Sequence, residues 1–221
     1  LFRKLPYDLM GDFAHVSAMA AFDLSLVVDG LSSFGSVADV LGFARSRPGQ
    51  LNIGTARVGS SQHLAASMFA AVAGIQAVIV PFKSTADIVS GLRNRDLHLA
   101  IETVPPLLTQ INAGNLHPLA ITARRRSAVL PAIPTLAEAG VTGIDVTSWN
   151  GISVPAATPP SVVEQLSAAI RQAVATPALR RDLLALGIET EAGGRLGMTQ
   201  RLREDIARWT VVIDKLGIER Q

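Results

Sequence analysis

The sequence has 221 residues, of which 48% are hydrophobic and 5% aromatic, and its formal net charge is +2. This length suits one large domain or two small ones, each with a core of Ala, Val, Leu and Ile. The absence of cysteine excludes disulfides and thiolate metal sites. Apart from three arginines at 124–126, which we interpret as a solvated loop, the basic residues are scattered. No basic stripe with interleaved aromatic residues is visible, so we expect no nucleic-acid partner.

The sequence also bears on membranes and export. No apolar run approaches the roughly 20 residues that a helix needs to cross a bilayer, so we expect a protein that is not embedded in the membrane. The first residue is Leu1, and nothing near it resembles a signal peptide. We therefore expect a processed or truncated chain. The lack of cysteine fits a bacterial cytoplasm and a periplasm equally well.

Strand and helix patterns alternate through the first two thirds of the chain. Residues 13–28 predict one or two strands, and 36–46 predict a helix that Ser36 and Asp39 open as a capping box. The elements expected next are a strand at 51–55, a helix from Ser61, a strand at 77–81, a helix after the capping box Ser84 and Asp87, a strand at 97–103, a helix at 105–114, a strand at 116–123 and a short helix at 134–140.

The last third is expected to be mainly helical. Residues 144–155 predict one long strand or a pair of strands. Helices follow at 158–176, at 177–187 and from about Met198 to Leu216. This alternation predicts βαβ units and a mainly parallel sheet, which is an α/β fold. In open sheets of this class, ligands bind beyond the carboxyl ends of the strands, where helix N-termini point.

The loop after the strand at 51–55 has the composition of an anion site. Gly54, Gly59, Ser60 and Ser61 precede a helix whose first amides are unpaired and carry partial positive charge. Glycine lets a ligand approach the main chain, and the serines add hydroxyl donors, so the loop suits a carboxylate or phosphate. It is not a Walker loop, because no Gly-Lys-Ser/Thr follows. The alternative is that a serine only caps the helix.

His63, one turn into that helix, raises the alternative of a Ser-His hydrolase with Ser60 or Ser61. Such an enzyme needs an orienting acid and an oxyanion hole, and the Gly-x-Ser-x-Gly elbow is absent. A capping or packing role suits His63 better, so we assign no catalytic residue. His98 and His117 have no acidic or His partner at ligand spacing, so we expect no metal site, and we assign no cofactor.

A second anion-ready junction follows the next strand. Lys83 lies at the strand end and supplies a cation, while Ser84 and Thr85 open the next helix. The competing interpretation is a solvated lysine beside an ordinary capping box. Two such junctions after successive strands are stronger evidence for an anion site than a single junction would be.

The third strand end carries Glu102 and Thr103. A carboxylate there either accepts a hydrogen bond from a ligand amine or hydroxyl, or balances Lys83; the competing interpretation is a surface glutamate. Farther along, Trp149 either roofs a pocket or belongs to the core.

Four segments, in this order and spacing, resemble a known family: PGQLNIGTARVGSSQHLAASMFAAVAG, VPFKSTADIVSGL, AITARRRSAVLPAIPTLAEAG and VTSWNGISVPAATPPSVVEQLSAAI. Together they resemble the substrate-binding proteins of tripartite tricarboxylate transporters, the Bug-type periplasmic solute receptors. The starting segment LFRKLPYDLMGDFAHVS resembles the stretch that leads into the family's first crossover. The resemblance covers essentially the whole chain.

The resemblance implies a periplasmic protein of the type II periplasmic-binding-protein kind. Two α/β lobes are then joined by crossing strands, with the ligand in the cleft. One lobe is expected at 29–148, and the other combines 1–28 with 149–221. Members of the family bind a small organic carboxylate, deliver it to a membrane permease and catalyse nothing.

The resemblance also implies a ligand site. The family's ligand loop matches Gly59, Ser60, Ser61 and His63, and its lysine segment matches 83–85, although the family's usual Tyr and Gly on either side of the lysine are Phe and Ser here. The acidic position, usually Asp, falls on Glu102. The family's Pro-Phe-x-x-Gly-Gly loop is missing at the front, so we expect a first lobe that is incomplete at its N-terminus and half a binding site. A cytoplasmic ligand-sensing effector domain and a degenerate chain without ligand are the other hypotheses.

Overall fold

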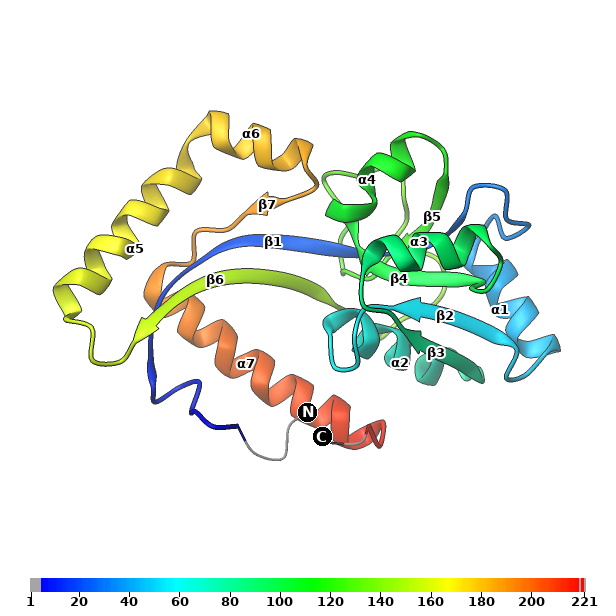
Figure 1. The fold of residues 1–221 in the computed structure, drawn as a ribbon, viewed down its shortest axis with the longest axis horizontal. Helices are drawn as coiled ribbons and strands as arrows, with labels where there is room; N and C mark the ends of the chain where they lie inside the picture. The colour runs from blue at the N-terminus through cyan, green and yellow to red at the C-terminus, as the bar shows by residue number, and fades with distance from the viewer. Residues whose placement is uncertain (1–4, 219, 221) are drawn as a thin grey trace. The chain divides into compact units, whose positions relative to one another are not determined.

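The computed structural model describes residues 5–218 and 220, and Figure 1 shows how its helices and strands follow one another. The described residues form two compact units: Phe22–Ser148 is one, and the residues up to Ala21 together with those from Trp149 onward are the other. In chain order the elements are β1 (Phe13–Asp29), α1 (Val37–Ser46), β2 (Leu51–Thr55), α2 (Ser61–Ala73), β3 (Ala77–Pro81), α3 (Thr85–Arg93), β4 (Leu99–Thr103), α4 (Val104–Asn112), β5 (Leu116–Ile121), β6 (Thr147–Pro155), α5 (Pro160–Ala175), α6 (Pro177–Ala185), β7 (Glu189–Thr190) and α7 (Gly194–Lys215).

The sheet of the 22–148 unit has the strand order β3-β2-β4-β1-β5. β2 pairs in parallel with β3 and β4, whereas β1 is antiparallel to both β4 and β5. Four strands therefore share one direction, and β1 is inserted among them in the opposite one. The α/β class predicted from the sequence is confirmed, but the sheet is mixed where a mainly parallel one was expected. Periodicity identifies a strand without specifying its direction.

Helices cover both faces of this sheet. The chain runs from β2 outward to β3 and then back past β2 to β4, so two right-handed crossovers place α2 and α3 on opposite faces. In agreement, Leu99, Ala100 and Ile101 of β4 are all fully buried, as expected of a strand packed on both sides. One core cluster joins α3 and α4 to the sheet, and its buried members are Val27, Ile88, Leu92, Leu97, Ala100, Leu107 and Leu116.

The second unit is built around strand pairs with β1. β6 and β7 both pair with β1, and the β7 pairing is antiparallel, with Ala20 opposite Thr190. The helices α5, α6 and α7 complete the unit, and α7 buries Met198 and Ile213. In the part of the chain that the structure describes, no helix is both long enough and apolar enough to cross a bilayer.

One predicted helix is wrong. Residues 134–140 form turns, and Thr135 makes an isolated parallel bridge with Ile121. The side chains close the turn: the Thr135 N–H donates to Glu138 Oε2 at 2.8 Å, and the Glu138 N–H donates to Thr135 Oγ1 at 3.1 Å. This reciprocal pair has the residue spacing of a capping box, so the sequence looked helical. Gly140, at φ 89°, then ends the turn before a helix can propagate.

Gly30, just after β1, provides a test of the packing. A Cβ at this position would come within 2.1 Å of the Gly114 carbonyl oxygen, an atom of the backbone that cannot move aside easily. We expect Gly30→Ala to lower the free energy of unfolding by about 1–3 kcal/mol, measured by urea denaturation. Gly42→Ala is the matched control, because a Cβ there meets nothing within 4 Å inside α1. That substitution should raise the free energy of unfolding by about 0.5–1 kcal/mol, and a loss equal to that of Gly30→Ala would contradict the steric explanation.

Candidate functional site

The three polar junctions predicted from the sequence lie at one edge of the sheet. β2 and β3 run in parallel with Thr55 opposite Pro81, and β2 and β4 run in parallel with Gly54 opposite Ala100. The carboxyl ends of the three strands therefore point the same way, and each is followed by a helix, after a loop in the case of β2 and β3. Glu102, two residues beyond the β2–β4 pairing, lies at this edge.

Glu102 connects the three junctions. Only 2% of this residue is exposed, and its carboxylate accepts four hydrogen bonds. Gln62 Nε2 donates at 2.5 Å from α2, Thr85 Oγ1 donates at 3.4 Å from α3, and Thr103 donates through its N–H at 2.7 Å and its Oγ1 at 3.0 Å. The interpretation of Glu102 as a surface residue is therefore wrong, and no ion pair with Lys83 is found among the described side chains. Glu102 holds the loops that surround it.

The N-terminus of α2 combines a cap with free amides. Ser60 is the N-cap residue, and its Oγ accepts the His63 N–H at 3.1 Å, so the capping role is real. Gly59, at φ 83°, takes a left-handed conformation that favours glycine. Within the described residues, the N–H groups of Ser61 and Gln62 have no intramolecular acceptor, as is usual for a first turn. The cap and an anion site are therefore compatible.

His63 does not form a hydrolase dyad with the neighbouring serines. Its Nδ1 is buried without a hydrogen-bond partner in the described structure. The Ser60 hydroxyl accepts a main-chain N–H, and the Ser61 hydroxyl donates to the Gln62 side chain at 3.1 Å. Burial lowers the pKa of His63 below 6.5, so the ring is neutral at pH 7 and does not attract an anion by charge.

The junction before α3 behaves as a capping box with an exposed lysine beside it. Ser84 Oγ accepts the Asp87 N–H at 3.2 Å and donates to Asp87 Oδ2 at 2.7 Å. Thr85 turns its hydroxyl to Glu102. Lys83 is exposed, and no carboxylate within the described residues pairs with it. Its ammonium is therefore available to a ligand.

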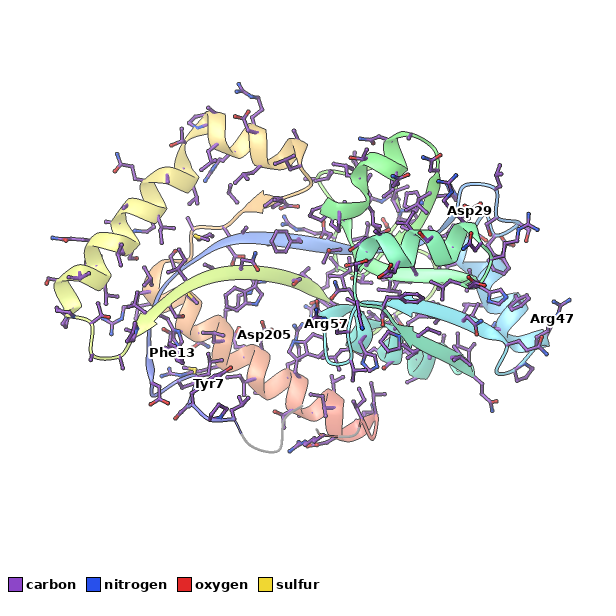
Figure 2. All side chains as sticks on the ribbon, viewed as in Figure 1. Tyr7, Phe13, Asp29, Arg47, Arg57 and Asp205 are labelled. Carbon is purple, nitrogen blue, oxygen red and sulfur yellow. The ribbon has the colours of Figure 1, made fainter. Side chains whose placement is uncertain are left out.

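Trp149 belongs to the other unit, where α7 holds it. Its Nε1 donates to Asp205 Oδ2 at 2.8 Å, and the Arg201 guanidinium lies 4.9 Å from the ring centroid. Arg201 also forms an ion pair with Glu191. Figure 2 labels Asp205 on α7. The side chain is thus fixed by a hydrogen bond and a cation–π contact rather than by a purely apolar core.

Sequence reasoning missed several polar residues. Arg57 is exposed in the loop between β2 and α2, three residues before the N-cap Ser60, and Figure 2 labels it. Its position inside the glycine- and serine-rich loop was a usable signal. The second unit contains a buried His15 whose Nδ1 lies 2.9 Å from Ser153 Oγ, while burial and Arg203 lower the pKa of His15. His15 and its partners are far apart in sequence, so no local motif predicts their contact.

The fold of this chain matches that of solved periplasmic binding proteins. The structure of periplasmic binding protein BugD superposes with a TM-score of 0.89 at 22% identity, covering 100% of this chain and 75% of that one. The R. palustris protein Rpa4515, solved with adipate, gives a TM-score of 0.93 at 31% identity, and the match covers 100% of this chain and 74% of that one. The fold class predicted from the sequence is confirmed.

The family follows from the sequence match. Residues 1–218 match the model of the tripartite tricarboxylate transporter family receptor, and the chain belongs to this family. A curated relative, the UPF0065 protein in the tcbD-tcbE intergenic region of Pseudomonas sp. strain P51, is 34% identical over 96% of this chain. The chain spans 63% of the length of that relative. The resemblance stated from the motifs is thereby confirmed.

Proposed function

We propose that this protein acts in the periplasm as a solute receptor, which binds a small organic carboxylate and delivers it to the membrane permease of a tripartite tricarboxylate transporter. Membership of the receptor family supports this role, and so does the adipate in the structure of a relative that is 31% identical. Both favour it over a cytoplasmic effector domain. We expect the protein to bind its ligand without turning it over.

The observation that carries the proposal is the electrostatic character of the strand-end edge. The Glu102 carboxylate already accepts four hydrogen bonds from the protein, so we do not expect it to bind the ligand. What remains for a ligand is positive: the free N–H groups at the start of α2, together with the side chains of Arg57 and Lys83. A helix N-terminus flanked by cations stabilises a carboxylate.

The strength of such a site is sufficient for a receptor. Each hydrogen bond to a charged group contributes about 1.5–3 kcal/mol. Two or three of them therefore give micromolar affinity once the ordering of ligand and side chains is subtracted. We propose that Gly59, Ser60 and Ser61 bind the carboxylate, that Lys83 supplies charge, and that Glu102 acts as a positioning residue.

Calorimetric titration with adipate tests this proposal. We expect binding by the unmodified protein and a rise in its melting temperature. Arg57→Gln and Lys83→Gln should each weaken adipate binding by about tenfold, because each removes a charged partner of the carboxylate. The matched control is Arg93→Gln, which neutralises an exposed cation at the opposite end of α3 and should leave the affinity unchanged.

Three results would overturn the proposal. The first is the absence of both a heat signal and a shift of the melting temperature when dicarboxylates, adipate included, are added to the protein. The second is an equal loss of affinity in Arg93→Gln and Lys83→Gln, which would point to general charge attraction. The third is equal binding of adipamide, the neutral analogue, which would show that the carboxylate is not what the protein recognises.

A further inference from the structure

A concave site lies in the 22–148 unit, at the sheet edge opposite Glu102. It is a cavity of about 530 Å³ between the β1–α1 loop, the end of α1 and the α3–β4 connection. Asp29 at its rim ends β1 and pairs with the first residue of β5, and His98 directly precedes β4. The cavity therefore lies at the amino ends of the parallel strands. Figure 2 shows Asp29 and Arg47 at this end and Arg57 at the other.

The main chain fixes the tautomer of His98 in this cavity. The Asn52 N–H donates to His98 Nδ1 at 3.1 Å, and the His98 N–H donates to the Asn52 carbonyl at 3.1 Å. Burial and the nearby Arg47 lower the pKa of His98 below 6.5, so the ring is neutral at pH 7. Because Nδ1 accepts a hydrogen bond, the ring hydrogen is on Nε2. No acceptor for it is found in the described part of the chain.

Two guanidinium groups in the lining are also without ion-pair partners. Neither Arg47 nor Arg95 pairs with a carboxylate in the part of the chain that the structure describes. Asp29 is the acidic group in the lining, and its Oδ1 already accepts the Leu31 N–H at 3.0 Å. Two positive charges thus oppose one carboxylate, and the cavity is net positive.

One wall of the cavity is aromatic. The Phe43 ring lies 4.9 Å from the His98 ring and 5.4 Å from the Phe34 ring, between their centroids. The Arg47 guanidinium lies 5.1 Å from the centroid of the same Phe43 ring. These contacts form within the protein itself, so the wall is ordered before a ligand binds. Binding of a planar ligand would therefore require little reordering of the side chains in this wall.

We propose that this cavity binds a small aromatic organic anion, with Arg47 and Arg95 as its charge partners and His98 Nε2–H as a hydrogen-bond donor. The volume falls in the range of small-molecule pockets. Guanidinium groups bind carboxylates with two parallel hydrogen bonds, while the phenylalanine rings in the lining supply apolar surface for an aromatic ligand. This site is separate from the carboxylate site proposed at the strand-end edge.

Benzoate is the probe, and its binding is followed by the main-chain amide signals of the protein in NMR titrations. We expect localised shifts at Leu31 and Asn52, and weaker shifts with benzamide, which has the ring without the charge. The double variant Arg47→Gln, Arg95→Gln should weaken benzoate binding by at least about tenfold. Arg93→Gln, which changes an exposed arginine two residues from Arg95 and outside the lining, should stay within about twofold.

The outcomes separate this proposal from the receptor function. Lys83→Gln should leave the benzoate shifts at Leu31 and Asn52 unchanged, and the double variant should leave adipate affinity unchanged, so each site can fail alone. The proposal is overturned if benzoate causes no localised shifts at millimolar concentrations. It is equally overturned if benzamide matches benzoate, or if Arg93→Gln loses binding as the double variant does.

Discussion

Replacing Glu102 with Gln should lower the free energy of unfolding by about 2–4 kcal/mol, because it removes a charged acceptor from a buried set of donors. The carboxylate accepts from Gln62, Thr85 and twice from Thr103. A glutamine can keep its oxygen at the Oε1 position, where Gln62 and Thr103 donate, but these three bonds then lose their charged acceptor. Its NH₂ takes the Oε2 position, where the Thr85 hydroxyl has to turn from donor to acceptor. Urea denaturation measures the loss, and adipate titration of the same variant measures its effect on binding.

The control for this variant is Glu164→Gln, which makes the same chemical change at an exposed helix position. Its free energy of unfolding should change little, because exposed ion pairs contribute little. Adipate affinity should fall in Glu102→Gln under conditions where the variant is still folded, because the loops that we propose to bind the ligand lose the carboxylate that connects them. Unchanged stability would show that the four hydrogen bonds do not hold these loops.

Replacing Phe69 with Ala should lower the free energy of unfolding by about 3–5 kcal/mol. Phe69 is fully buried and is the largest of the side chains that α2 contributes to the core. Its removal leaves a cavity that the surrounding closely packed residues fill only in part. Because α2 carries the free amides at its other end, loosening this anchor should also weaken adipate binding. Urea denaturation and calorimetry measure the two effects.

Val72→Ala is the matched control on the same helix. Val72 is 48% exposed, so its truncation removes few contacts and should change the free energy of unfolding by no more than about 0.5 kcal/mol. Alanine has the higher helix propensity, so a loss in Val72→Ala as large as that in Phe69→Ala would mean that contacts on the exposed side of α2, and not the buried ring, hold the helix. The comparison therefore isolates the contribution of burial.

The elements were predictable where hydrophobic period and caps agreed. Ser36 and Ser84 cap their helices as the capping-box pattern predicted, because this interaction is local. The direction of β1 was not predictable, since it depends on pairing with β4 and β5, which are distant in sequence. The turns at 134–140 were mistaken for a helix because a bridge to Ile121 overrides a short local preference.

The candidate site was predictable to the level of its three loops. Their place after successive strands followed from the alternating pattern, and parallel pairing brings those strand ends to one edge. The burial of Glu102 was not predictable, because it results from the packing of α2, α3 and α4 around one position. The cavity at the opposite edge had no sequence signal either, since its arginines and aromatic rings come from segments with no shared motif.

Because one carboxylate serves Gln62, Thr85 and Thr103, the effects of altering these three residues should not sum. Once one donor is lost, the acceptor is free to rearrange toward the others. A substitution at one member of the cluster therefore changes the hydrogen bonds of the others. The exposed Arg57 and Lys83, which we propose as charge partners of the ligand, are outside the cluster, so replacing them removes no donor from Glu102.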